Sequence, residues 1–138
     1  MNFVFRPHGR FKVWTEGQLL LTEVTGPWNR ELIDYWAQQA RDLVAEFSAE
    51  RPYVAITTVF ESILCPADAI ERIAQAVQHS RTNLPSLANV IVVGKDVDGR
   101  DIVKRTYQRI GLEHIFEDFE SAKTWSECLL KKQQISLV

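Results

Sequence analysis

The stretch YVAITTVFESILCPADAIERI, from Tyr53 to Ile73, joins a β-branched, apolar segment to a segment with helical character. The part from Tyr53 to Val59 predicts a buried strand, because its residues are those enriched in strands. A helix is expected to begin at Pro66, since the N–H that proline lacks would have no partner in a first turn. Asp68 supports this start, because negative charge is favourable there. A strand that leads into a helix indicates an α/β fold.

Upstream of this stretch, two strands are expected over Phe11–Thr15 and Gln18–Thr25, joined at Glu16-Gly17. A glycine in so short a connection is a hairpin signal. A helix is predicted from Asn29 to Phe47, because apolar side chains recur there at intervals of three and four residues. Asn29 is its expected N-cap.

Downstream, ANVIVV (Ala88–Val93) is almost entirely apolar, which is typical of a strand covered on both faces of a parallel sheet. Asp98 is expected to cap a third helix that ends at Gly111. A short strand at Ile115-Phe116 and a fourth helix over Phe119–Lys132 complete the predicted elements.

This order predicts an α/β fold with a mixed, mostly parallel sheet of four or five strands, opened by a hairpin, and about four helices. The length of 138 residues suits a single domain over 1–138. Its core is expected over about 11–130, with loosely ordered residues at the N-terminus and after 132.

Composition excludes several classes of partner. The formal net charge is −2, from 16 basic and 18 acidic residues, so nucleic acid is not expected to bind. No apolar run is long enough for a membrane span, and the N-terminus does not resemble a signal peptide. Cys65 and Cys128 lack CxxC spacing, so we expect reduced thiols and a cytoplasmic location.

No catalytic motif is found, so the chain is not expected to be an enzyme or to hold a cofactor. His8, His79 and His114 lie on separate predicted elements without the spacing of a metal site. The loop GKDVDGR (Gly94–Arg100) matches neither a P-loop nor an EF-hand. A nucleophilic pair of Cys65 with a distant histidine is an open alternative, although a thiol among apolar residues is usually inert.

Two of the four tryptophans are expected in the core and one at the surface. Trp36 and Trp125 lie on the apolar stripes of predicted helices. Trp14 alternates with Phe11 and Val13 along its strand, so it is expected to face outward. An exposed tryptophan there would favour an interface, because this residue is enriched at binding hot spots.

Five segments together carry a resemblance to a known family. They are GQLLLTEVTGPWNRELIDYW (Gly17–Trp36), YVAITTV, CPADAIERI, ANVIVV and IFEDFESAKTW (Ile115–Trp125). The pattern resembles the STAS superfamily, the sulphate-transporter and anti-sigma-factor-antagonist fold, and within it the SpoIIAA-like branch of small bacterial domains. The branch is also similar in fold to CRAL-TRIO lipid-transfer domains.

The resemblance implies a regulatory role without catalysis. In anti-sigma-factor antagonists, the turn before the second helix carries an Asp-Ser-Ser-Gly-like motif with a serine that a partner kinase phosphorylates. Here Cys65-Pro66-Ala67-Asp68 stands at that place and has no hydroxyl group, so no phosphorylation site is assigned. The expected function is a non-enzymatic regulatory or protein-interaction module that lacks the usual phosphorylatable serine.

The loop FESILC places apolar side chains just before a helix, where loops are usually polar. One interpretation is that these side chains fill the core. The other is a contact surface for a protein partner, a second copy of the chain or a lipid-like ligand, and a small carrier of an apolar ligand is the alternative function. The candidate contact residues are Phe60, Ser62, Ile63, Leu64, Cys65 and Asp68.

Overall fold

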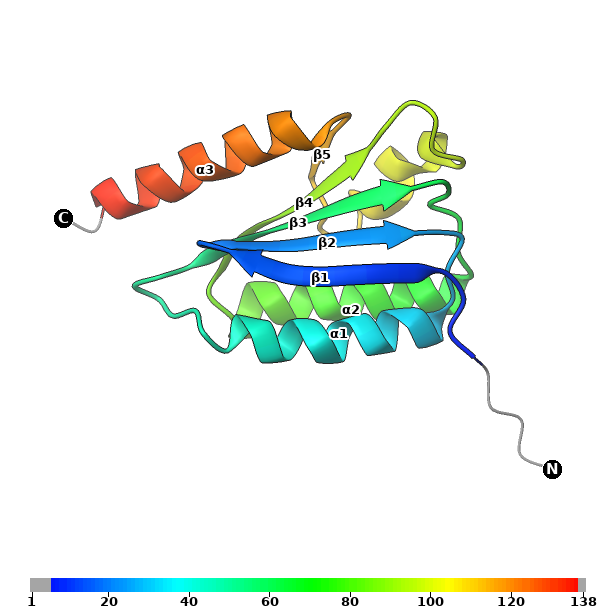
Figure 1. Cartoon of the computed structure of the whole chain (residues 1–138), viewed down its shortest axis with the longest axis horizontal. Helices are drawn as coiled ribbons and strands as arrows, with labels where there is room; N and C mark the ends of the chain where they lie inside the picture. The colour runs from blue at the N-terminus through cyan, green and yellow to red at the C-terminus, as the bar shows by residue number, and fades with distance from the viewer. Residues whose placement is uncertain (1–5, 137–138) are drawn as a thin grey trace.

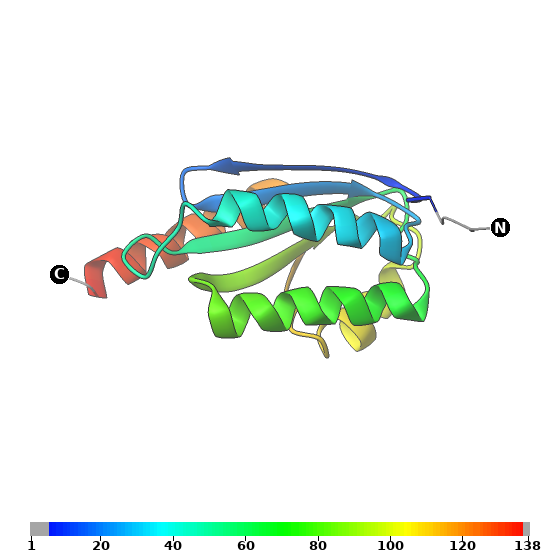
Figure 2. The same ribbon diagram turned by 90° about the horizontal axis from the view of Figure 1, so that it is seen from below.

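The computed structural model describes residues 6–136 of this chain as a five-stranded sheet with helices on both faces (Figures 1 and 2). The strands are β1 (Arg10–Glu16), β2 (Leu19–Thr25), β3 (Tyr53–Phe60), β4 (Ser86–Val93) and β5 (His114–Phe116). The helices are α1 (Arg30–Val44), α2 (Ala67–Asn83) and α3 (Phe119–Ser136), with the short helical turns η1 (Arg100–Ile102) and η2 (Val103–Tyr107) before β5. The ends predicted to be loosely ordered fall partly on residues 1–5 and 137–138, which lie outside the described part.

The strands lie in the order β1-β2-β3-β4-β5. β1 is antiparallel to β2, and all the other neighbouring pairs are parallel, which confirms the predicted hairpin and the mostly parallel sheet. The hairpin turns at Gly17, whose φ of 56° lies in the left-handed region that glycine adopts readily. β3 lies at the centre of the sheet, between β2 and β4.

Alternate residues of each strand face opposite layers. In Figure 1, α1 and α2 lie below the sheet and α3 lies above it, and Figure 2 shows α1 and α2 side by side. Val54, Ile56 and Val90 belong to the core cluster that includes Ala122 of α3. Tyr53 faces the other layer, where its ring stacks on that of Phe47 with centroids 5.0 Å apart.

The predicted third helix is wrong in its start and in its type. The chain instead forms a 3₁₀ turn, η1, followed by a single π-helical turn, η2, and Gly99 with a φ of 83° stands before them. Asp98 does not cap this segment, because the N-cap position is Gly99 and no described side chain bonds to the first turn. The Asp98 N–H donates to the Glu61 carbonyl at 2.8 Å, and the Asp98 carbonyl accepts from the N–H of Ile63 at 2.9 Å. The expected end at Gly111 has the left-handed backbone of a helix terminus, with a φ of 104°.

α1 and α3 begin as their sequences predict and end differently, whereas α2 begins at Ala67, one residue after the predicted Pro66, which is its N-cap. Asn29 caps α1, since its Oδ1 accepts from the N–H of Leu32 at 3.2 Å. This helix ends at Val44 rather than at the predicted Phe47. α3 runs past the predicted end, to Ser136.

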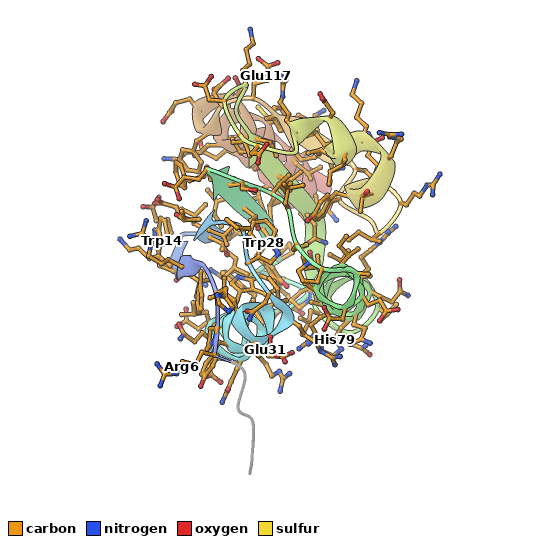
Figure 3. The ribbon with its side chains drawn as sticks, turned by 90° about the vertical axis from the view of Figure 1, so that its right-hand side faces the viewer. Arg6, Trp14, Trp28, Glu31, His79 and Glu117 are labelled. Atoms are coloured by element: carbon orange, nitrogen blue, oxygen red, sulfur yellow. The ribbon has the colours of Figure 1, made fainter. Side chains whose placement is uncertain are left out.

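Trp14 lies at one side of the sheet, as Figure 3 shows, and is half-buried rather than fully outward. It faces the layer of α3, opposite to Phe11 and Val13. The ammonium group of Lys12 lies 4.9 Å from the centroid of its ring. An aromatic side chain covered by a neighbouring lysine is a weak argument for an interface.

Candidate ligand-binding cleft

The six predicted contact residues, which lie in and beside the loop between β3 and α2, differ in exposure, and Cys65 is half-buried. Phe60 and Leu64 are 42% and 41% exposed, and Asp68 is exposed as well. Ser62 and Ile63 are buried, and Ile63 has no exposed surface. The loop therefore contributes Ser62 and Ile63 to the buried interior and exposes the side chains of Phe60 and Leu64.

The backbone of this loop explains the difference in exposure. Glu61 has a φ of 67°, which is uncommon for a residue other than glycine, and turns the chain sharply after β3. The next residue, Ser62, forms an isolated parallel bridge with Asp98. Ile63 is then held from both sides, because its N–H donates to Asp98 and its carbonyl accepts from the hydroxyl of Tyr107 at 3.2 Å. These bonds direct the Ile63 side chain into the core.

Cys65 contacts the same tyrosine but is not poised for nucleophilic chemistry. Its Sγ lies 3.5 Å from Tyr107 Oη, and the residue is half-buried. Burial raises the pKa of the Cys65 thiol, and the hydrogen bond with Tyr107 lowers it by a smaller amount. Burial is also the main cause of the raised pKa of Tyr107. Both groups are therefore protonated at neutral pH, and a thiol is a much weaker nucleophile than a thiolate.

An apolar cleft of about 140 Å³ lies between α1, α2 and the face of the sheet that these helices cover. β2, β3 and β4 form its floor, and the two helices form its walls. The floor includes Leu20, Thr22, Ala55, Thr57 and Asn89, and the walls include Trp36, Ala37, Ala40, Ile73 and Ala76. Trp28 lies at one end of the cleft, near the centre of the view in Figure 3.

Small side chains keep the cleft open. Ala37 and Ala40 on α1 and Ala76 on α2 line it, and an alanine side chain ends at Cβ. Beneath them, Ala55 and Thr57 of the central strand are only half-buried. A central strand covered by two helices is normally inaccessible, because protein interiors are close-packed. The cleft therefore reaches the sheet itself.

Basic side chains gather at the rim of the cleft. Arg72 of α2 donates from Nε to Asp34 Oδ1 of α1 at 2.7 Å and so ties the two helices together. Arg41 and His79 lie further along the same helices, and Figure 3 shows His79 at the outside of α2. The rim thus has three basic groups and one paired carboxylate, whereas the floor has no charged group.

Metal ligands do not gather in the described part of the chain. His, Cys, Asp and Glu residues form no group of three or more there that could hold a metal ion. None of the helices in residues 6–136 is both long enough and apolar enough to cross a membrane. No protein-family model, curated protein or solved structure matches this chain.

None of the cleft residues is among the contact candidates drawn from the sequence. Two features of the sequence are compatible with a cleft at this place, although they do not distinguish it from close helix packing. The apolar stripes of α1 and α2 contain alanines at 37, 40 and 76, where larger side chains would fill the space. Thr57 and Asn89 interrupt strands that are otherwise largely apolar, at positions that face the helices.

Proposed function

We propose that this chain is a non-enzymatic binding module that holds a small apolar molecule in the cleft between α1 and α2. The observation that carries the proposal is the accessibility of Ala55 and Thr57 on the central strand, beneath a gap lined by alanines. A space lined by apolar side chains and left without partner atoms loses dispersion contacts. A ligand that fills it restores these contacts and removes its own apolar surface from water.

The size of the cleft limits the ligand to about one ring. An engineered cavity of about 150 Å³, lined by apolar side chains, binds benzene. The cleft described here, at about 140 Å³, is of the same size. A fatty acid with a long chain would have to leave most of its tail in solvent.

The STAS-like assignment and a cytoplasmic location belong to the same proposal. They are supported by the β1–β2 hairpin, by the parallel β2-β3-β4 order and by the two free cysteines, Cys65 and Cys128. A module without the phosphorylatable serine needs another way to change its state. Ligand binding under α1 and α2 would provide one.

Filling the cleft tests the proposal. Ala76→Phe is expected to weaken the binding of a single-ring probe by more than about tenfold, because the new ring occupies the same space. Binding is measured by the rise in melting temperature with added toluene and by amide chemical shifts. Gln75→Phe is the matched control, since Gln75 is exposed on the same helix and lies outside the cleft lining. Equal loss in both variants, or toluene binding that Ala76→Phe leaves unchanged, would contradict the proposal.

Phe60 and Leu64 support a second candidate function, which is contact with a protein partner or a second copy of the chain. They lie on either side of the buried Ser62 and Ile63 in the sequence and yet expose large apolar side chains. Leu64→Asp is expected to remove a specific partner recovered with the wild-type protein, or to shift a dimer to monomer in sedimentation. Equal recovery and equal sedimentation of both proteins at high micromolar concentration would count against this surface.

A further inference from the structure

The floor of the cleft carries polar side chains in the middle of an apolar surface. Three of them lie on adjacent strands: Thr22 on β2, Thr57 on β3 and Asn89 on β4. Thr22 pairs directly with Thr57 across the strands, and Asn89 pairs with Ala55, two residues before Thr57. All three face α1 and α2. They therefore form a short polar row across the central strands.

All three members of this row have hydrogen-bonding capacity left over, and Thr57 has the most. Thr22 Oγ1 already accepts from the indole N–H of Trp36 at 2.9 Å, which leaves only its own O–H and one lone pair without a protein partner among the described residues. Asn89 donates from Nδ2 to the hydroxyl of Ser80 at 3.2 Å, and Ser80 in turn donates to the Val77 carbonyl at 2.7 Å. This chain of bonds orients the Asn89 amide and leaves its Oδ1 without a donor among the described residues. The Thr57 hydroxyl has no partner among them at all.

The Thr57 hydroxyl is not among the buried polar atoms that lack a partner, so it is accessible from the cleft and free to bond to a molecule that enters it. Valine would fit the Thr57 position on the apolar floor, and it is also a good strand former. The hydroxyl therefore does not serve packing. Together with the oriented Asn89 carbonyl it offers one group that can donate or accept and one group that can only accept.

We propose that the molecule bound in the cleft is neutral and single-ring, with one hydroxyl or N–H group that enters first and bonds to Thr57 and Asn89. This inference deepens the proposed function and rests on it. The ligand group donates to Asn89 Oδ1 and accepts from the Thr57 hydroxyl, or donates to either. Phenols and small nitrogen heterocycles have this chemistry.

The charge distribution excludes an acidic head group at the floor. The arginines and the histidine lie at the rim, on α1 and α2, and the polar floor groups are neutral. A carboxylate placed beside Thr57 would lose its hydration without meeting a cation, which is strongly unfavourable. An acid would bind only with its charge outward, near Arg41 and Arg72, and would leave the polar row unused.

The test compares phenol with toluene, which have the same shape and number of heavy atoms, and adds benzoate as the charged probe. Each is titrated into the wild-type protein and into Thr57→Val, with dissociation constants taken from amide chemical shifts. Thr57→Val is expected to change the ratio of the phenol and toluene dissociation constants by roughly three- to tenfold, in favour of toluene. Without ligand, the variant is expected to unfold at the same temperature as the wild type or a higher one, so a loss of folding does not confuse the result.

The outcomes separate this inference from the proposed function. Toluene and phenol that bind with an unchanged ratio in Thr57→Val would overturn the hydrogen-bonding role and leave the cleft as an apolar site. Benzoate binding more tightly than both would overturn the neutral ligand in favour of one held by the basic rim. Absence of binding by all three probes would overturn the proposed function and this inference together.

Discussion

Ile63→Asp is expected to remove most of the free energy of unfolding, whereas Leu64→Asp at the next position is expected to change it by no more than about 0.5 kcal/mol. The two side chains belong to the same apolar loop before α2. One has no exposed surface and belongs to the core cluster with Trp28, Val59 and Tyr107, and the other is 41% exposed.

The size of the Ile63 effect follows from two terms. Truncation of a buried isoleucine alone costs about 2–5 kcal/mol, through lost transfer energy and the cavity left behind. An aspartate adds a carboxylate in an apolar surrounding, with the Ile63 backbone already bonded to Asp98 and Tyr107. The sum exceeds about 4 kcal/mol, which is a large part of the 5–15 kcal/mol of a typical domain.

Urea unfolding followed by tryptophan fluorescence measures both variants against the wild type. Similar unfolding midpoints for Ile63→Asp and the wild type would show that the loop is not part of the core. A large loss in Leu64→Asp would show that its exposed position is wrong. The pair also shows why Leu64→Asp, and not Ile63→Asp, is suited to test a protein contact at this loop.

The elements that follow from local patterns were predictable from the sequence. The β1–β2 hairpin depends on Gly17, and the start of α1 depends on Asn29, whose side chain bonds only three residues away. Such signals act within one turn of the chain. The apolar run of β4 indicated a strand covered on both faces, and its residues do alternate between two core clusters, with Ile91 and Val93 in one and Val90 and Val92 in the other.

The segment after β4 was not predictable in this way, because its conformation depends on a distant loop. The spacing of Ile102, Val103 and Tyr107 is compatible with an ordinary α-helix. However, the backbone of Asp98 bonds to Glu61 and Ile63, which belong to the loop before α2. These bonds hold Asp98 in an extended bridge, and the turns start only after Gly99 and are irregular.

The cleft was missed for a similar reason. Its existence depends on the separation of α1 and α2 on the sheet, which no local pattern reports. An alanine on an apolar stripe is compatible with either close helix packing or a gap. Only the half-buried Ala55 and Thr57 on the central strand distinguish these cases, and they require the three-dimensional arrangement.

Gly26→Ala is the second substitution with a large expected effect, with a loss of about 3 kcal/mol or more in the free energy of unfolding. Gly26 is buried where the chain leaves β2, and its N–H donates to the Phe60 carbonyl at 3.1 Å. A Cβ at this position would overlap the carbonyl oxygen of Ser62 and lie 2.8 Å from Cε3 of Trp28. Because the overlapped atom is backbone, a side-chain rotation cannot relieve the clash.

The clash matters because it lies where the loop after β2 crosses the loop after β3. Moving Ser62 away would break its bridge with Asp98 and displace Ile63 from the core, so the strain spreads to both interactions that hold the loop before α2. Gly94→Ala is the matched control, since its Cβ would meet only the Glu117 carbonyl at 3.7 Å, an ordinary contact, and it lacks a left-handed φ. Gly94→Ala is expected to unfold within about 0.5 kcal/mol of the wild type. Thermal and urea unfolding of the two variants side by side gives the comparison, and equal stability would mean that the two loops do not cross as closely as the structure places them.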